Sequence, residues 1–121
     1  ICEEKSSGID RVVQAAEAYQ LPAPDFRAAH RRTVVTIYGP RPFEEMDRDD
    51  RIRACYQHCC LRYVMNQRMT NQSLRERFKL PEKKAEAVSR VIRDTMRAKK
   101  IKLSDPAMTS LRYRSYEPFW A

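Results

Sequence analysis

The chain has 121 residues, of which 24 are lysine or arginine and 16 are aspartate or glutamate, and its formal net charge is +8. This length can bury one moderate core or two small ones, and no apolar run approaches the length needed to cross a bilayer. We therefore expect a soluble, cytoplasmic protein without a membrane partner.

Residues 1–46 predict one helix and one hairpin, followed by a linker. The helix spans about Ile9 to Gln20, where apolar residues recur at helical spacing, and the segment 21–24, Leu-Pro-Ala-Pro, ends it. Two β-prone runs, Asp25–Ala29 and Thr33–Tyr38, are separated by three residues, which is short enough for a hairpin turn. A unit this small is not an independent domain. Because the chain starts with Ile1, we expect it to be a piece of a longer protein.

A long helix is predicted from about Asp49 to Arg68. The acidic residues at positions 44–50 suit its N-terminus because the helix dipole favours negative charge there. Its apolar positions recur at helical spacing and comprise Ile52, Cys55, Tyr56, Cys59, Tyr63 and Val64.

This helix also carries three of the four cysteines. Cys55, His58 and Cys59, with Cys2 as a distant fourth ligand, could bind zinc, but structural zinc usually takes paired ligands from short loops. Buried cysteine in a reducing compartment is the preferred interpretation, and no metal is predicted.

The stretch Met69–Leu103 predicts two short helices joined by a tight turn and followed by a strand, which is the outline of a winged helix-turn-helix. Thr70 or Asn71 can cap the first helix, and the proline at position 81 ends it because the residue before a proline leaves the α region. The second helix spans about Pro81 to Lys99. Its core-facing stripe is Ala85, Val88, Val91, Ile92, Thr95 and Met96, and its opposite face carries Lys83, Glu86, Arg90, Arg93 and Arg97.

That opposite face has two interpretations. It can be a solvated surface with Glu86–Arg90 or Arg90–Asp94 pairs, or a recognition helix whose basic side meets phosphates and the major groove. Residues 1–50 hold 7 basic and 10 acidic side chains (−3), whereas residues 51–121 hold 17 and 6 (+11). This asymmetry favours nucleic acid as the partner, although membranes and acidic proteins would also attract such a surface. No aromatic side chains interleave with the basic ones on these two helices, which favours duplex over single-stranded nucleic acid.

The C-terminal residues predict a wing and an aromatic tail. Residues 104–106, Ser-Asp-Pro, are a turn signal. The β-prone segment Thr109–Phe119 would then form the hairpin wing, with Arg112 and Arg114 available for minor-groove or phosphate contacts. The tail, Tyr116–Ala121, is expected to pack across the open edge of the three-helix core. The predicted fold is thus α+β: a winged helix-turn-helix at 47–121, with a three-helix core and β-hairpin wing, preceded at 1–46 by a helix and β-hairpin from an upstream domain.

Three segments, Ser7–Val12, Met69–Lys102 and Tyr116–Ala121, resemble the C-terminal region of bacterial proteins described as RecG-related ATP-dependent DNA helicases. Those proteins are similar to transcriptional regulators in which a Schlafen-type AlbA module precedes a GHKL-like ATPase fold and a winged helix. The resemblance implies that residues 1 to about 43 are the last helix and hairpin of the GHKL-like domain.

Phosphate-binding motifs are missing from this stretch. Ser6 stands where the family would carry glycine, and neither Gly8 nor Gly39 begins the Gly-Lys-Ser or Gly-Lys-Thr of a P-loop. We expect no helicase or ATPase activity and no cofactor in this chain, with ATP confined to the parent protein.

These features predict double-stranded DNA binding by a winged helix within a transcriptional regulator. The predicted contact residues are Gln72, Ser73, Arg75, Lys83, Lys84, Arg90, Arg93, Arg97, Arg112 and Arg114. The alternative is a protein-interaction or homodimerisation module of a multidomain ATPase-like protein, with an exposed apolar patch around Phe119 and Trp120 or Met65 and Met69. An enzyme is not expected, because neither His30 nor His58 has a neighbouring acid and nucleophile at a recognisable spacing.

Overall fold

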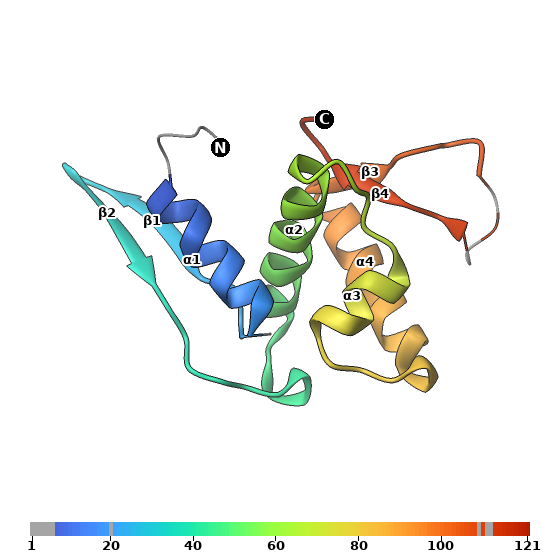
Figure 1. Ribbon diagram of the computed structural model, residues 1–121, viewed down its shortest axis with the longest axis horizontal. Helices are drawn as coiled ribbons and strands as arrows, with labels where there is room; N and C mark the ends of the chain where they lie inside the picture. The colour runs from blue at the N-terminus through green and yellow to red at the C-terminus, as the bar shows by residue number, and fades with distance from the viewer. Residues whose placement is uncertain (1–6, 20, 109, 111–112) are drawn as a thin grey trace.

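The computed structural model describes residues 7–19, 21–108, 110 and 113–121. Within these residues the chain is an α+β protein in which four α-helices accompany two separate two-stranded antiparallel sheets. Helix α2 lies at the centre, with α1 and the β1–β2 hairpin on one side and α3, α4 and the β3–β4 hairpin on the other (Figure 1).

The N-terminal unit is the predicted helix and hairpin. Helix α1 spans Ser7–Ala18, and strands β1 (Asp25–Ala29) and β2 (Arg32–Thr36) pair from Asp25 opposite Thr36 to Ala29 opposite Arg32. The turn contains only His30 and Arg31, and Arg31 adopts a left-handed φ of 60°. Strand β2 therefore starts one residue earlier than predicted and ends at Thr36. The hairpin projects away from the helices (Figure 1), and every residue of β2 is exposed.

Helix α2 spans Arg48–Val64 and follows the short 3₁₀ helix η2 (Phe43–Glu45). Asp47 caps it, because its carboxylate accepts a 2.8 Å hydrogen bond from the backbone N–H of Asp50. The helix ends at Val64, before the predicted Arg68, since Asn66 adopts a left-handed φ of 63°.

Helices α3 (Asn71–Arg77) and α4 (Ala85–Arg97) are joined by the 3₁₀ helix η3 (Glu82–Lys84), so the first turn of the helix predicted from Pro81 is 3₁₀ rather than α. Thr70, one of the two predicted caps, is the cap of α3 and forms a capping box with Ser73. Helix α3 ends before Lys79 and helix α4 before Lys99, and both lysines have a left-handed φ, as Asn66 does after α2. At each end, backbone N–H groups after the helix donate hydrogen bonds to carbonyls of the last helical turn.

The core lies between α2, α3 and α4. The predicted inward stripe of α4 is confirmed for Val88, Val91, Ile92 and Thr95, which are buried, while Met96 is half-buried. The same apolar cluster includes Ala23, Phe43 and Met46 from the N-terminal part of the chain. The division near residue 46 stays a prediction.

The C-terminal hairpin joins β3 (Ile101–Leu103) to β4 (Tyr116–Pro118), and Met69 adds an isolated bridge to Tyr116. Strand β4 is much shorter than the predicted segment Thr109–Phe119, part of which lies outside the described residues. The tail packs on α2, as predicted: Trp120 Nε1 donates a 3.1 Å hydrogen bond to the hydroxyl of Tyr56 and meets Tyr63 edge-on at 5.4 Å. None of the described helices has the length and apolar character to cross a membrane.

Candidate nucleic-acid interface

The outward face of α4 carries the basic stripe predicted from its periodicity. Arg90, Arg93 and Arg97 are exposed, and Lys83 and Lys84 extend the exposed basic surface onto η3. This flank is open because α2 and α3 pack on the opposite, apolar side of α4. All five side chains are exposed, so none of the described residues of the N-terminal unit or of the aromatic tail covers them.

The ion pairs on this face differ from the predicted ones. Glu86 lies 3.6 Å from Arg93 rather than pairing with Arg90, and Asp94 is 3.3 Å from Arg48 of α2. The expected Glu86–Arg90 and Arg90–Asp94 pairs are therefore wrong, since a guanidinium from a neighbouring helix takes the carboxylate of Asp94. Arg90 forms no ion pair with any residue that the structure describes.

Ser73 cannot serve as the predicted DNA contact. It is buried, and its hydroxyl accepts a 3.0 Å hydrogen bond from the backbone N–H of Thr70 and lies 3.0 Å from His58 Nε2. Its place in the capping box turns it inward. Gln72 on the same helix is exposed, whereas Arg75 is half-buried and donates to the side-chain oxygen of Asn71 at 2.8 Å.

The predicted wing contacts are only partly described. Arg112 lies outside the described residues. Arg114 is half-buried beside Tyr116, and its buried Nε has no hydrogen-bond partner among the described groups. Burial raises the pKa of Tyr116, and the adjacent guanidinium of Arg114 opposes that rise. Arg114 is thus turned towards the hairpin instead of reaching fully into solvent.

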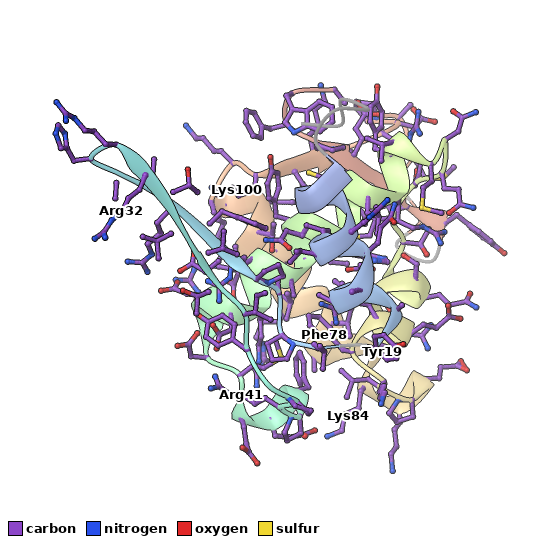
Figure 2. All side chains as sticks on the ribbon, turned by 60° about the vertical axis from the view of Figure 1, so that its left-hand side comes forward. Tyr19, Arg32, Arg41, Phe78, Lys84 and Lys100 are labelled. Atoms are coloured by element: carbon purple, nitrogen blue, oxygen red, sulfur yellow. The ribbon has the colours of Figure 1, made fainter. Side chains whose placement is uncertain are left out.

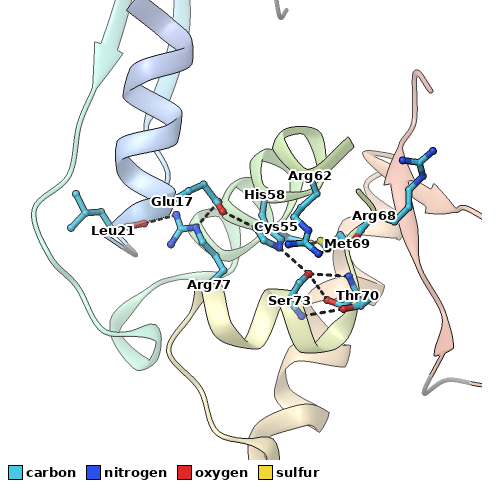
Figure 3. Close-up of polar contacts among 10 residues, drawn as sticks. All are labelled: Glu17, Leu21, Cys55, His58, Arg62, Arg68, Met69, Thr70, Ser73 and Arg77. Atoms are coloured by element: carbon cyan, nitrogen blue, oxygen red, sulfur yellow. Dashed lines mark hydrogen bonds and ion pairs between the residues drawn. The ribbon is translucent and has the colours of Figure 1, made fainter. Parts of the chain in front are cut away.

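A buried polar network joins α1 to α2 and α3 (Figure 3). Glu17 places Oε2 at 2.7 Å from His58 Nδ1 and Oε1 at 2.6 Å from Arg77 Nε. Arg77 also donates to the carbonyl of Leu21. Burial alone would raise the pKa of Glu17, but the hydrogen bond from His58 and the positive charges of His58 and Arg77 outweigh it and lower that pKa. The carboxylate is therefore ionised and accepts both hydrogen bonds.

No acid and nucleophile stand at a recognisable spacing from His58 in the sequence, but the fold brings Glu17 and Ser73 to its ring. The order Glu17, His58, Ser73 resembles a carboxylate–histidine–serine triad, yet the Ser73 hydroxyl is also bonded to the backbone N–H and carbonyl of Thr70. Neither His58 nor Ser73 lines the groove at the ends of α1 and α3 or the small hollow between α2 and α4. We therefore interpret the network as a structural tie. Periodicity could not reveal it, because Glu17 lies 41 positions before His58.

The cysteines of α2 are core residues. Cys55 and Cys59 are fully buried, and burial raises the pKa of the Cys55 thiol to about 12 and that of Cys59 as well. Both ring nitrogens of His58 are engaged, and no group of three or more metal-ligating side chains occurs among the described residues. Cys2, the suggested fourth ligand, lies outside them.

The larger of these two hollows is a groove of about 750 Å³ between the end of α1, the 40–46 segment and the end of α3. Tyr19 and Phe78, which are labelled in Figure 2, both line it. None of the described predicted contact residues borders this groove. The smaller hollow, of about 60 Å³, lies between α2 and α4 and is bordered by Arg90 together with Arg48 and Arg51. Arg48 and Arg51 were not among the predicted contact residues, since their approach to α4 depends on how the helices pack.

Comparisons with models of known protein families, with curated proteins and with solved structures find no match to this chain.

Proposed function

We propose that residues from α2 to β4 form a winged helix-turn-helix that binds double-stranded DNA, with α4 as the recognition helix. The element order supports this proposal: three helices are followed by an antiparallel hairpin, and Met69, just before α3, bridges that hairpin. The long loop between β3 and β4 corresponds to the wing.

The open basic face of α4 is the observation that carries the proposal. A helix about 10–12 Å across fits a major groove about 12 Å wide. Arg90, Arg93 and Arg97 follow one another at three- and four-residue intervals and so lie along one side of the helix. A single row of cations along a groove-sized helix suits contacts with phosphates and with guanine edges.

The neighbouring elements supply supporting contacts. Lys83 and Lys84 extend the basic surface at the N-terminal end of α4, and Gln72 is exposed on α3. Such groups would contact the DNA backbone and orient α4 without reading sequence. A role in a cytoplasmic transcriptional regulator, and ATP binding in its parent protein, belong to the same proposal.

Fluorescence anisotropy with random and promoter duplexes at several salt concentrations tests the proposal. The logarithm of the association constant should fall linearly with the logarithm of salt concentration, by about 0.9 for each phosphate neutralised. Arg90→Ala should weaken binding while leaving the melting temperature nearly unchanged, because the side chain is exposed. Arg27→Gln, on the projecting β1 strand, is the matched control. No binding even at low salt would defeat the proposal.

A protein-interaction module is the second candidate, and exposed apolar side chains favour it. Met65 is 56% exposed, Phe119 is 53% exposed and Ile37, beyond β2, is 65% exposed, whereas Met69 is fully buried and offers no contact. Within the described residues, no further strand pairs with either edge of the β1–β2 hairpin, so both edges could accept a partner strand. Sedimentation showing a dimer that Trp120→Ala disrupts, together with no DNA affinity, would favour this function.

A further inference from the structure

The smaller hollow, between the first turn of α2 and the middle of α4, is lined by three arginine residues. It has a volume of about 60 Å³, several times the ~15 Å³ that one water molecule needs. Arg48 and Arg51 of α2 and Arg90 of α4 border it, with Asp94 as the one carboxylate in its lining. The remaining walls are apolar and come from Ile52, Ala87 and Val91.

The charges around this hollow do not cancel. Three guanidinium groups against one carboxylate leave a formal balance of +2. Asp94 is engaged by Arg48 at 3.3 Å, and Arg90 has no ion-pair partner among the described residues. Positive charge is therefore left over beside the apolar wall of the hollow, where an anion would find donors on two helices.

The Arg51 side chain beside the hollow is fixed by contacts with Phe43. Its Nη2 donates a 2.8 Å hydrogen bond to the carbonyl of Phe43, and its guanidinium carbon lies 3.9 Å from the centre of the Phe43 ring, so the side chain is held in place. Its Nε is buried and has no hydrogen-bond partner among the residues that the structure describes. Since solvent does not reach this atom, its N–H group can report on a charge bound in the neighbouring hollow without bonding to it.

We propose that this hollow binds a phosphate oxyanion, held by Arg48, Arg51 and Arg90. Guanidinium groups present several N–H donors in a fixed plane, and such forks match phosphate oxygens. The phosphate comes either from the DNA backbone or from free phosphate. The first source rests on the proposed DNA-binding function. In the first case the hollow fixes the position of α4 on the duplex, since one phosphodiester would be held by two different helices.

Inorganic phosphate is the direct probe. In ¹H–¹⁵N spectra of the whole chain, the Arg51 Nε–H signal, assigned with Arg51→Lys, should shift and saturate with phosphate but not with chloride at equal ionic strength. Arg90→Gln should weaken phosphate binding about tenfold, the effect of losing one charge-assisted hydrogen bond. Asp94→Asn should strengthen it, because a negative charge is removed. Arg97→Gln, also on α4 but outside the hollow, should leave it unchanged. The absence of a saturating shift, or an equal response to chloride, overturns the proposal.

Duplex DNA then identifies the source of the phosphate. Two results together assign the site to the DNA backbone. The duplex should displace inorganic phosphate, as seen at the Arg51 signal, and the salt dependence of DNA binding should have a slope about 0.9 smaller in Arg90→Gln. Phosphate binding without DNA binding supports the hollow as a site for free phosphate and defeats the proposed function instead. DNA binding without any response of Arg51 to either ligand overturns the hollow and leaves the proposed function standing.

Discussion

Oε1 of Glu17 accepts a 2.6 Å hydrogen bond from Nε of Arg77, a residue sixty positions later in the chain. Since Oε2 of the same carboxylate lies 2.7 Å from His58, one side chain of α1 holds both α2 and α3. The N-terminal unit is thereby tied to the helical core by charge as well as by apolar packing. The contribution of this tie to stability can be measured separately from DNA binding by the basic face.

Glu17→Gln should destabilise the protein strongly. The change leaves the buried guanidinium of Arg77 without a counter-charge, and breaking a buried ion pair from one side costs about 3 kcal/mol. Urea unfolding followed by circular dichroism measures this loss. Glu82→Gln, at an exposed position on η3, should change the free energy of unfolding by less than about 0.5 kcal/mol. Equal effects of the two substitutions would show that the tie contributes little.

Stability should fall in acid because of the same carboxylate. The folded pKa of Glu17 is lowered relative to an unfolded value of about 4.3, so the unfolded chain binds more protons between the two values and stability rises with pH there. The ionised Glu17 carboxylate makes its full contribution to folding stability above about pH 4.3. This contribution is lost as the pH falls through the lower pKa of the folded state. Urea midpoints recorded across this range should decline less steeply for Glu17→Gln than for the unmodified protein.

Thr70→Ala should lower the free energy of unfolding by about 1 kcal/mol, the usual loss of stability when an N-cap side chain is removed. The threonine hydroxyl accepts a 3.1 Å hydrogen bond from the backbone N–H of Ser73, and alanine has no acceptor there. Thr70→Ser retains the hydroxyl and is the matched control. Both changes are compared by thermal unfolding, and a serine variant as unstable as the alanine variant would argue that the methyl group matters instead.

Tyr56→Phe should loosen the aromatic tail. The substitution removes the oxygen that accepts the Trp120 indole N–H at 3.1 Å and should cost about 1 kcal/mol. Because Trp120 is the only tryptophan, tryptophan fluorescence reports the surroundings of this one side chain. We expect emission at longer wavelength and stronger quenching by iodide. Unchanged emission would mean that ring packing against Tyr63 is sufficient to hold the tail.

Cys55 and Cys59 should resist alkylation in the folded protein. Both thiols are fully buried, and burial raises their pKa values, so little thiolate forms at pH 8 and reagents cannot reach it. Mass spectrometry after iodoacetamide treatment should find these two positions modified only in denaturant. Rapid labelling without denaturant would show that α2 opens readily.

The features that follow from local rules were the ones predictable from the sequence. The apolar stripe of α4 depends only on residue spacing, which is why Val88, Val91 and Ile92 are buried where they were expected. The Thr70 cap and the β1–β2 turn likewise need only neighbouring residues. The amino-acid order alone therefore determined which side of α4 presents arginine to solvent.

Packing between helices decided the rest. Ser73 is a small polar residue of the kind usually found at the surface, but its hydrogen bonds in the capping box and to His58 turn it inward. Asp94 pairs with Arg48 across two helices instead of with Arg90 one turn away, and Glu17 finds its partners far along the chain. A helix-by-helix interpretation contains no information on such pairs, because their distances are set by how α1, α2, α3 and α4 pack against one another. The buried tie and the arginine-lined hollow accordingly exist only in the folded molecule.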